Sequence, residues 1–365
     1  MKRMISLVLV LALGLTAKVA KADFTFGEPA NLGPTINTSY PEYSPCISVD
    51  GLSLYFASWY GAYGIDDIFL STRETTEDDW GPPVNLGPLV NSSAGEYHPA
   101  ISTDALELYF ERYYRDAEGN ILGIEILATK RATRSDPWDQ PVKVDLAVGN
   151  GELAGAPSLS ADGLELYFSA CRFEDEPKAR LCVTRRETKD APWGEPVSLG
   201  PIVNSWSSQV ASRISSDGLL LLFCDWWGFD SPRPGGFGDV DMWFARRATK
   251  DGDWEEPVNL GPLVNTAFRD FLGMISPDGS TIYFSSTRPG GSGYYDLWQA
   301  QIEPVVDLNS DGIVDSADMV IMVDNWGTDN SLCDIGPMPW GDGIVDVQDL
   351  IVLAEHLFEE IPPAE

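Results

Sequence analysis

The stretch DLNSDGIVDSAD, residues 307 to 318, concentrates oxygen-bearing side chains at regular spacing, and Gly312 within it permits a sharp turn. A hard cation such as Ca²⁺ takes about six to eight oxygen ligands, and a calcium loop supplies them from positions 1, 3, 5, 7, 9 and 12. These positions hold Asp307, Asn309, Asp311, Ile313 (through its carbonyl), Asp315 and Asp318. The clustered carboxylates would repel one another without an ion, so the sequence predicts a calcium loop here rather than an acidic linker.

A second copy of the pattern, WGDGIVDVQDLIVLAEHLF, follows some thirty residues later and repeats the later half of the loop. Its positions 5, 7, 9 and 12 hold Asp342, Ile344, Asp346 and Asp349. Counting back places Met338 and Trp340 at positions 1 and 3, and neither side chain is a ligand for a hard cation. A longer loop would allow Asp334 to supply the missing oxygen. We therefore predict a second, less regular calcium loop.

Two such loops, each with Asp at position 12 and an apolar helical segment behind it, resemble a type I dockerin over residues 303–360. The resemblance implies a small all-α, EF-hand-like calcium-binding domain that docks onto a cohesin-type partner protein. In dockerins the partner is recognised largely at loop positions 10 and 11, which here are Ser316, Ala317, Val347 and Gln348. The two pairs differ, which argues against symmetric binding in two orientations.

The N-terminal residues 1–22 have the pattern of a secretory signal peptide. Lys2 and Arg3 precede the apolar run ISLVLVLALGL, and small residues end the segment at Ala22. The run is too short to span a bilayer, and no other stretch is long and apolar enough. We therefore expect a mature chain that starts near Asp23, is secreted to the extracellular space or cell surface, and has no membrane span.

Net charge excludes several classes of partner. The formal charge is −32, and the predicted signal carries four basic residues and no acidic one, so the mature chain has a charge of −36. Nucleic acids and anionic membranes are bound mainly through Lys and Arg, so neither is an expected partner. Residues 303–365 contain fifteen Asp or Glu and no Lys or Arg, and this shift in composition marks a second module.

Cysteine and histidine are both scarce. Five cysteines in a chain of 365 residues are too few for a disulfide scaffold. Cys171 and Cys182 could bridge neighbouring strands, but buried free thiols are the simpler interpretation. His98 and His356 are the two histidines, which excludes a His-rich zinc site.

Residues 23–302 consist of a five-fold repeat. The motif SVDGLSLYF at Ser48 returns as STDALELYF, SADGLELYF, SSDGLLLLF and SPDGSTIYF, at intervals of 54, 58, 55 and 61 residues. A second motif, of the form WGPPVNLGPLVN, keeps step with it. Each unit contains four short apolar or aromatic runs, here called A to D, bounded by Asp, Gly, Pro and Asn, which is typical of strands and turns.

Four-stranded units repeated at this length predict a β-propeller. The chain begins with a D motif, FGEPANLG from Phe26, and its last unit stops after strand C at YYDLWQAQI. The N-terminal segment can therefore complete the last blade, which gives five blades. The predicted fold class is an all-β five-bladed propeller followed by the small all-α calcium-binding domain.

The last unit, SPDGSTIYFSSTRPGG, resembles the WD40-like (PD40) repeats of TolB-type propellers, and the resemblance covers roughly residues 24–302. It implies the fold but not one function, because such propellers include binding, scaffold and catalytic members. Six blades are common in that family, so five repeats depart from it.

Blade order assigns loops to faces: if the DG turns join strands A and B on one face, the B–C and D–A loops share the other. The B–C loops carry paired aromatics, which are candidates for stacking on sugar rings: Trp59, Tyr60, Tyr113, Tyr114, Trp226, Trp227, Tyr294 and Tyr295. Acids on the same rim are catalytic candidates: Glu42, Glu96, Asp225 and Asp270. The sequence leaves open that these aromatics pack between blades and that the acids are solvated or bind a cation.

Two functions of different classes follow. A non-catalytic propeller joined to a dockerin would bind carbohydrate or protein within an extracellular, polysaccharide-degrading assembly. Alternatively, two rim carboxylates would act as acid and base or nucleophile of a glycoside hydrolase. The repeats are nearly equivalent, with a modest break at Ala154 and Arg180 where other units have acids, whereas a catalytic site usually breaks symmetry in one or two blades. We therefore favour the binding function over the hydrolase. A purely structural role for the propeller is the third interpretation that the sequence allows.

Overall fold

The computed structural model describes residues 24–60, 63–149, 151–172, 178–206, 208–225, 233–328, 330, 332–336, 341 and 344–361. The predicted signal segment lies outside these residues, as do Trp226, Trp227 and Asp342. Within the described part, no helix is long and apolar enough to cross a membrane, and all five cysteines are free.

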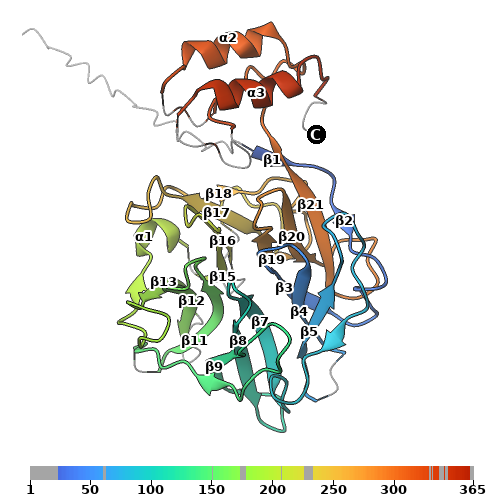
Figure 1. The fold of residues 1–365 in the computed structure, drawn as a ribbon, viewed down its shortest axis with the longest axis vertical. Helices are drawn as coiled ribbons and strands as arrows, with labels where there is room; N and C mark the ends of the chain where they lie inside the picture. Colours follow the sequence, from blue (N-terminus) through green and yellow to red (C-terminus); the bar gives the residue numbers. More distant parts are fainter. Residues whose placement is uncertain are drawn as a thin grey trace, which may run out of the picture.

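Residues 24–304 form a five-bladed all-β propeller, as predicted (Figure 1). The first blade contains β3 (Glu42–Ile47), β4 (Ser53–Ser58), β5 (Asp67–Thr72) and β6 (Val84–Asn85). The second contains β7 (Gly95–Ile101), β8 (Glu107–Arg115), β9 (Ile121–Lys130) and β10 (Val142–Lys143). The third contains β11 (Leu153–Leu159), β12 (Glu165–Arg172), β13 (Lys178–Arg185) and β14 (Val197–Ser198).

The fourth blade contains β15 (Gln209–Ile214), β16 (Leu220–Asp225), β17 (Met242–Arg246) and β18 (Val258–Asn259), and the one-turn helix α1 (Gly200–Val203) precedes it. The fifth blade combines both ends of the repeat region: β19 (Asp270–Ile275), β20 (Thr281–Ser286) and β21 (Asp296–Pro304) pair with the N-terminal β1 (Phe24–Phe26) and β2 (Ala30–Asn31). The N-terminal segment therefore closes the ring, as the phase of the repeats predicts.

The repeated serine explains why every unit turns at the same point. The Ser48 hydroxyl donates to Asp50 Oδ1 at 2.6 Å and accepts from the backbone N–H of Ser53 at 2.9 Å. The same pair of bonds recurs from Ser102, Ser160, Ser215 and Ser276. Gly51 between them has φ of +70°, a conformation that glycine adopts without strain. The Ser-x-Asp-Gly motif is thus a turn that joins strand A to strand B.

Arginine links neighbouring blades near the outer strands. Arg186 stacks on Trp193 of its own blade, 4.5 Å from the ring centroid, and its guanidinium donates to the Tyr109 hydroxyl of the preceding blade at 3.3 Å. Arg73 and Arg247 make the equivalent pair of contacts. The Trp that opens the strand D motif in the first four blades is therefore a packing residue, and the ring is joined by polar as well as apolar contacts.

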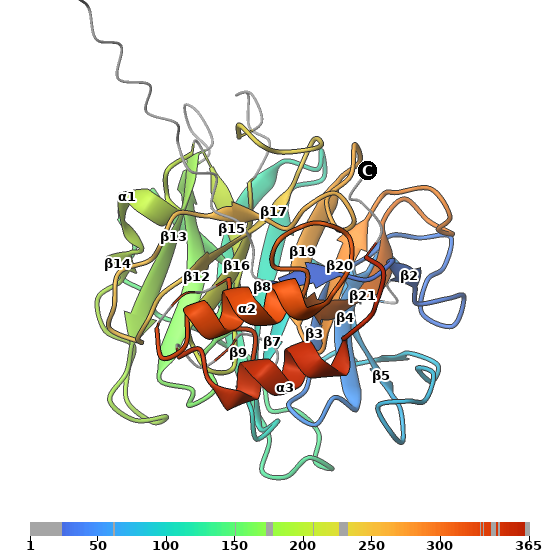
Figure 2. The same ribbon diagram turned by 90° about the horizontal axis from the view of Figure 1, so that it is seen from above.

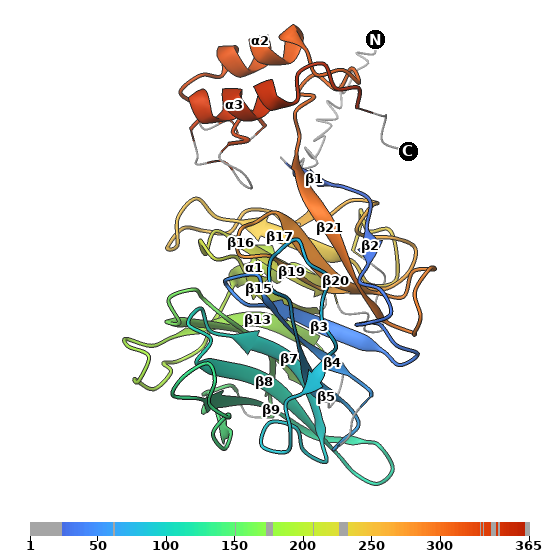
Figure 3. The same cartoon turned by 45° about the vertical axis from the view of Figure 1, so that its right-hand side comes forward.

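The C-terminal segment follows β21 and contains α2 (Ser316–Asp324) and α3 (Val347–Glu355), which lie side by side (Figures 1 and 2). Val314, Met322, Val345 and Leu353 are fully buried within its own apolar cluster. β21 begins at the rim beside the B–C loops and runs away from it toward this segment (Figure 3). The segment therefore lies beside the ring, beyond the outer strands of the fifth blade (Figures 1 and 2).

Candidate functional site

The innermost strand of each blade bends at the same position. A bulge interrupts the pairing of β3, β7, β11, β15 and β19 with the next strand. The residue at the bulge lies four positions before the repeated serine and has positive φ in every blade, from 50° to 60°: Ser44, His98, Ala156, Ala211 and Leu272. Such bulges turn a side chain away from the sheet, and here they place five side chains around the propeller axis.

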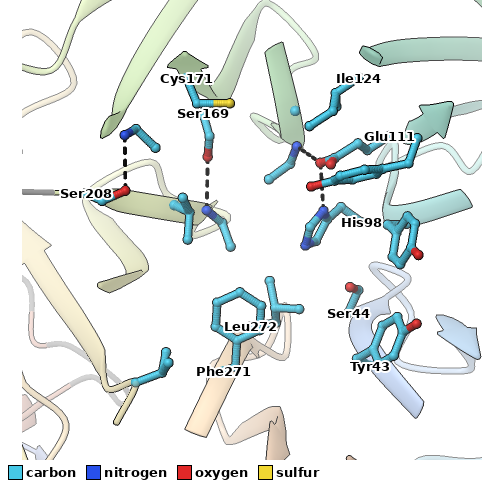
Figure 4. Close-up of a pocket in the computed structure, with 18 of the residues that line it drawn as sticks. Tyr43, Ser44, His98, Glu111, Ile124, Ser169, Cys171, Ser208, Phe271 and Leu272 are labelled. Carbon is cyan, nitrogen blue, oxygen red and sulfur yellow. Dashed lines mark hydrogen bonds and ion pairs between the residues drawn. The ribbon is translucent and has the colours of Figure 1, made fainter. Parts of the chain in front are cut away.

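These residues line an axial cavity of about 370 Å³ (Figure 4). It lies toward the face that carries the B–C and D–A loops. The register pairs Glu42 at the start of β3 with Ser58 at the end of β4, and Ser58 with Asp67 at the start of β5, so these strand ends mark that face. Much of its wall is apolar or aromatic, with rings from Tyr43, Tyr97, Tyr113, Phe271 and Tyr295. A mostly apolar concave site with a few polar groups is the usual form of a small-molecule site.

Arg213 belongs to the fourth blade, and its side chain reaches across the ring to the third and second blades. Its side chain is 5% exposed, and its guanidinium donates to the carbonyl oxygens of Pro157, at 2.6 Å, and Pro99, at 3.2 Å. Burial lowers the pKa of this arginine, and the negative charge of Glu111 opposes that shift. The residues at the equivalent positions in the first and second blades, Cys46 and Ala100, are also buried. The cavity therefore has a floor rather than a passage through the ring.

His98 and Glu111 form a dyad in the wall of this cavity. Nδ1 of His98 lies 2.8 Å from Oε2 of Glu111, which also accepts from the backbone N–H of Ala156 in the next blade (Figure 4). Glu111 is 2% exposed. The carboxylate accepts hydrogen bonds, so Nδ1 carries its proton toward Glu111, and in the neutral imidazole Nε2 is then an acceptor. Nε2 is buried, and no group of the described chain bonds to it.

The dyad modifies a contact that the third, fourth and fifth blades make with a small side chain. Ser169 accepts from the backbone N–H of Ala211, Cys224 from that of Leu272 and Ser285 from that of Ser44. In each case the side chain on the second strand binds the bulge residue of the next blade. Glu111 occupies this position in the second blade, and Ala57, which has no acceptor, occupies it in the first. A structural contact made elsewhere by a small side chain is made here by a carboxylate that also holds a histidine.

A second acid lies beside the cavity but is covered. Asp66 is 3% exposed and accepts from the hydroxyls of Tyr43 and Tyr97, whose rings are stacked with centroids 5.8 Å apart. Burial raises the pKa of Asp66 to about 6. Two tyrosines therefore separate this carboxylate from the cavity.

The four acids predicted as catalytic candidates do not line the cavity. Each lies at or next to the end of a strand at the rim and is almost completely buried: Glu42, Glu96, Asp225 and Asp270. Three of them accept from the backbone N–H and hydroxyl of a Ser or Thr four residues earlier in the D–A loop. The shared contact indicates that these carboxylates hold the loop in place.

Counter-ions distinguish these acids from one another. Arg112 lies 2.6 Å from Glu96, Arg233 lies 2.8 Å from Asp225 and Arg288 lies 2.8 Å from Asp270. In the described residues no cation pairs with Glu42, and the position equivalent to Arg288 is Tyr60. Burial raises the pKa of Glu42 to about 7, against weaker opposing hydrogen bonds from Thr38 and Ser58.

The predicted aromatic residues divide into two groups. Tyr113 and Tyr295 line the cavity. The others that the structure describes lie on the rim: Trp59 (56% exposed), Tyr60 (63%), Tyr294 (60%) and Tyr114 (37%). Tyr60 packs against Tyr40 from the adjacent D–A loop, with centroids 5.6 Å apart. The rim is thus aromatic beside the first and fifth blades.

The first predicted calcium loop wraps its backbone around its own carboxylates. Asp307 accepts from the backbone N–H groups of Asp311 and Gly312, at 3.1 and 2.9 Å. Asp318 is fully buried and accepts from three N–H groups, those of Leu308, Asn309 and Asp315. Asp315 caps α2 and accepts from Ala317. In the described residues, no group of three or more His, Cys, Asp or Glu side chains forms a metal centre.

The second loop repeats these contacts. Asp349 is fully buried and accepts from Ile335, Gly336 and Asp346, as Asp318 accepts from Leu308, Asn309 and Asp315. This correspondence makes Asp334, rather than Met338, the equivalent of Asp307. The loop is therefore four residues longer than the first, and the carboxylate of Asp334 lies against the backbone of Gly341. Ile344 is exposed, and Asp346 caps α3.

The residues predicted to contact a cohesin begin the two helices and are all exposed: Ser316, Ala317, Val347 and Gln348. Apolar side chains on α2 extend this exposed surface, since Val320 and Val323 are 57% and 56% exposed. On α3, Ile351 also belongs to this exposed apolar surface, because its side chain is 54% exposed.

Sequence reasoning missed the dyad. Aligning the five units would have revealed it, because His98 stands where the others have Ser, Ala, Ala and Leu, four residues before the serine. Glu111 stands nine residues after the serine, where the others have Ala, Ser, Cys and Ser. At the predicted break, Ala154 is buried on β11, and Arg180 pairs with Glu152.

Neither a protein-family model nor a curated protein matches this chain. Solved structures match at low identity. A thermostable family-43 glycoside hydrolase is 14% identical, with 75% of this chain and 92% of that chain covered and a TM-score of 0.46. A putative TolB from Agrobacterium tumefaciens is 14% identical, with 78% and 99% covered and a TM-score of 0.41. An α-L-arabinofuranosidase from Lactobacillus brevis is 11% identical, with 74% and 92% covered and a TM-score of 0.47. Likeness at this level leaves the chemistry of the chain to be argued from its own residues.

Proposed function

We propose that the propeller is a glycan-binding module whose site is the axial cavity together with the aromatic rim beside it. The observation that carries the proposal is the cavity itself, with its tyrosine and phenylalanine walls and the dyad of His98 and Glu111. Aromatic faces pack against the C–H surfaces of sugar rings, and polar groups at fixed positions bind the hydroxyls. The net charge of the mature chain, −36 after removal of the predicted signal, favours a neutral ligand over an anionic one.

The rim extends the same chemistry outward. Trp59, Tyr60 and Tyr294 present exposed ring faces next to the opening, where a longer chain would continue. Isolated exposed aromatics are common on protein surfaces, but these three come from two adjacent blades and lie on the face that carries the cavity.

A glycoside hydrolase is the alternative, and the geometry favours binding over it. Hydrolysis of this type uses two carboxylates on either side of the glycosidic bond. Glu111 is the one carboxylate among the described lining residues, and it is bound to His98 and Ala156. Glu42, Glu96, Asp225 and Asp270 serve the loops instead.

For the C-terminal segment we propose a calcium-dependent docking module of the dockerin type, carried on an exported protein. The residues that would hold Ca²⁺ are Asp307, Asn309, Asp311, Ile313, Asp315 and Asp318 in the first loop and Asp334, Asp342, Ile344, Asp346 and Asp349 in the second. Carboxylate oxygens retain lone pairs beside those that accept N–H groups. The ion would neutralise the clustered charge and fix the loops to the helices.

The position of this segment suits such a role. β21 leads away from the cavity face, so a cohesin-type partner bound at the exposed starts of α2 and α3 would leave the cavity accessible. The assembled protein would then present its glycan site outward from an extracellular complex.

Calorimetric titration of the full mature chain with a panel of plant and algal oligosaccharides tests the binding function, and reducing-end release is measured in the same samples. We expect saturable binding without release. Release that disappears in Glu111→Gln would favour the hydrolase, and an absence of binding across the panel would refute the glycan function. Calcium is tested separately by scanning calorimetry with Ca²⁺ or EDTA, where we expect one transition, that of the C-terminal segment, to move.

A further inference from the structure

We propose that the axial cavity takes the end of a glycan chain, and that Nε2 of His98 accepts a hydrogen bond from a hydroxyl of the terminal sugar unit. This inference rests on the proposed glycan-binding function and specifies which part of the glycan is recognised.

The shape of the cavity favours a chain end. Arg213 crosses the axis and is bound to Pro99 and Pro157, so a polymer cannot pass through the ring. A volume of about 370 Å³ is at the lower end for small-molecule sites, which suits a short terminal portion rather than a long internal segment. The exposed aromatics lie at the rim and not at the floor. The rest of the glycan would leave the cavity past this rim.

The chemistry of His98 specifies the contact. Glu111 faces Nδ1, so in the neutral imidazole Nε2 is the acceptor, and this buried atom has no partner in the described chain. A buried acceptor is stabilised by a donor, and the donors of a neutral sugar are its hydroxyl groups. The imidazole cannot turn away easily, because Glu111 is also bound to Ala156 in the neighbouring blade.

A metal ion is a less suitable occupant. His98 is the one histidine of the propeller, and in the described chain no His, Cys, Asp and Glu side chains gather into a metal centre. Glu111 already accepts from Ala156 and faces His98. A neutral donor is therefore the complement that this acceptor requires.

The chain contains only two histidines, which makes the contact directly observable. Tag-free full-length mature protein with ¹⁵N-labelled histidine gives imidazole signals for His98 and His356, and His356, in the C-terminal segment, serves as the internal reference. The ligands are length series of xylan, arabinan and galactan oligosaccharides, each compared with its parent polymer at equal mass. We expect apparent affinity to follow the concentration of chain ends, and the Nε2 signal of His98 alone to shift on binding.

A substitution tests the same contact. His98→Asn retains a residue that tolerates positive φ but removes Nε2 from the wall of the cavity. We expect it to weaken binding of the shortest binding oligosaccharide about tenfold. The control, His356→Asn, makes the same exchange at the other histidine and should leave affinity unchanged. Circular dichroism verifies that both variants fold.

The outcomes separate the two proposals. Binding that depends on mass rather than on chain ends, an unmoved His98 signal in the bound state, or full affinity in folded His98→Asn would each overturn end recognition and leave glycan binding in place. No binding of any series would overturn the glycan function and this inference together. End-dependent binding with a shifted His98 signal and a selective loss in His98→Asn would support both.

Discussion

Two regions of this protein are built from repeats, and they use repetition in opposite ways. In the propeller, positions shared by the five units make turns and loops: the serine binds its aspartate, and the rim acids bind Ser or Thr of the D–A loop. The candidate site lies where one blade departs from the others, at His98 and Glu111. In the C-terminal segment, the two units keep the same aspartates in the same contacts.

The difference has a physical reason. A ligand on the propeller axis meets all five blades at once, so a specific contact requires that one blade present a different group. Each calcium loop would instead enclose its own ion, so both copies need the same oxygen ligands. Repetition therefore marks structure in the propeller and marks the proposed metal ligands in the C-terminal segment.

The largest expected effect is at the shared aspartates of the C-terminal segment. Asp318→Ala removes a fully buried carboxylate and leaves three backbone N–H groups without their acceptor, and we expect a loss on the order of 3 to 5 kcal/mol, enough to unfold the segment. Asp349→Ala should have the same effect if the two copies are equivalent. Chymotrypsin digestion measures this, because the segment has no Lys or Arg for trypsin. Asp324→Ala, at an exposed position, is the control; resistance of Asp318→Ala to the protease would contradict the prediction.

The next effect concerns Glu42, the rim acid without a counter-ion. Its pKa rises on folding from 4.5 to about 7, so its favourable contribution is complete below about pH 4.5 and is lost as the pH rises through 7. Glu42→Gln, which is always neutral, should be more stable than the wild type at pH 8 by up to about 3 kcal/mol, and similar to it at pH 5. Urea unfolding at the two pH values measures the difference.

The matched control for that measurement is Glu96→Gln. Its carboxylate is paired with Arg112, so neutralising it leaves a guanidinium without its partner. We expect destabilisation at both pH values. Equal behaviour of the two variants would mean that the counter-ion does not distinguish the first blade from the second.

Much of the architecture could be predicted because repeats record what every unit must do. Strand order, the number of blades, closure by the N-terminal segment and the shared face of the B–C and D–A loops all follow from the spacing of one motif. The same logic explains what was not predicted. Glu42, Glu96 and Asp270 recur because each supplies an acceptor to its rim loop, and a sequence does not reveal that such an acid is buried.

The candidate site was harder to predict because it depends on differences and on bulges. A residue four positions before the serine faces the axis only because its backbone has positive φ, and strict alternation along a strand does not anticipate this. The sequence pointed to Asp334 as an alternative ligand. Its equivalence to Asp307 became clear only from the hydrogen bonds that Ile335 and Gly336 donate to Asp349.

A smaller effect is expected at the contacts that the blades share around the axis. Ser169→Ala removes the acceptor for the backbone N–H of Ala211, and we expect a cost of about 1 to 2 kcal/mol in urea unfolding. Ala57→Ser makes the reverse change in the first blade: it adds a hydroxyl at the position that, by the repeat, faces the backbone N–H of His98. If the contact is equivalent in all blades, this variant should gain a fraction of that energy; a loss would show that the first blade packs differently.

The smallest effect on stability, and the sharpest separation of rim from cavity, is expected for Trp59→Ala. The side chain is 56% exposed, so unfolding free energy should change by less than about 0.5 kcal/mol. Binding of longer oligosaccharides should weaken severalfold, because their outer units lose a stacking surface, while the shortest binding oligosaccharide should keep its affinity. His98→Asn should weaken both. Calorimetric titration of the two variants with one length series makes the comparison, and a loss of short-chain binding in Trp59→Ala would place recognition on the rim instead of the axis.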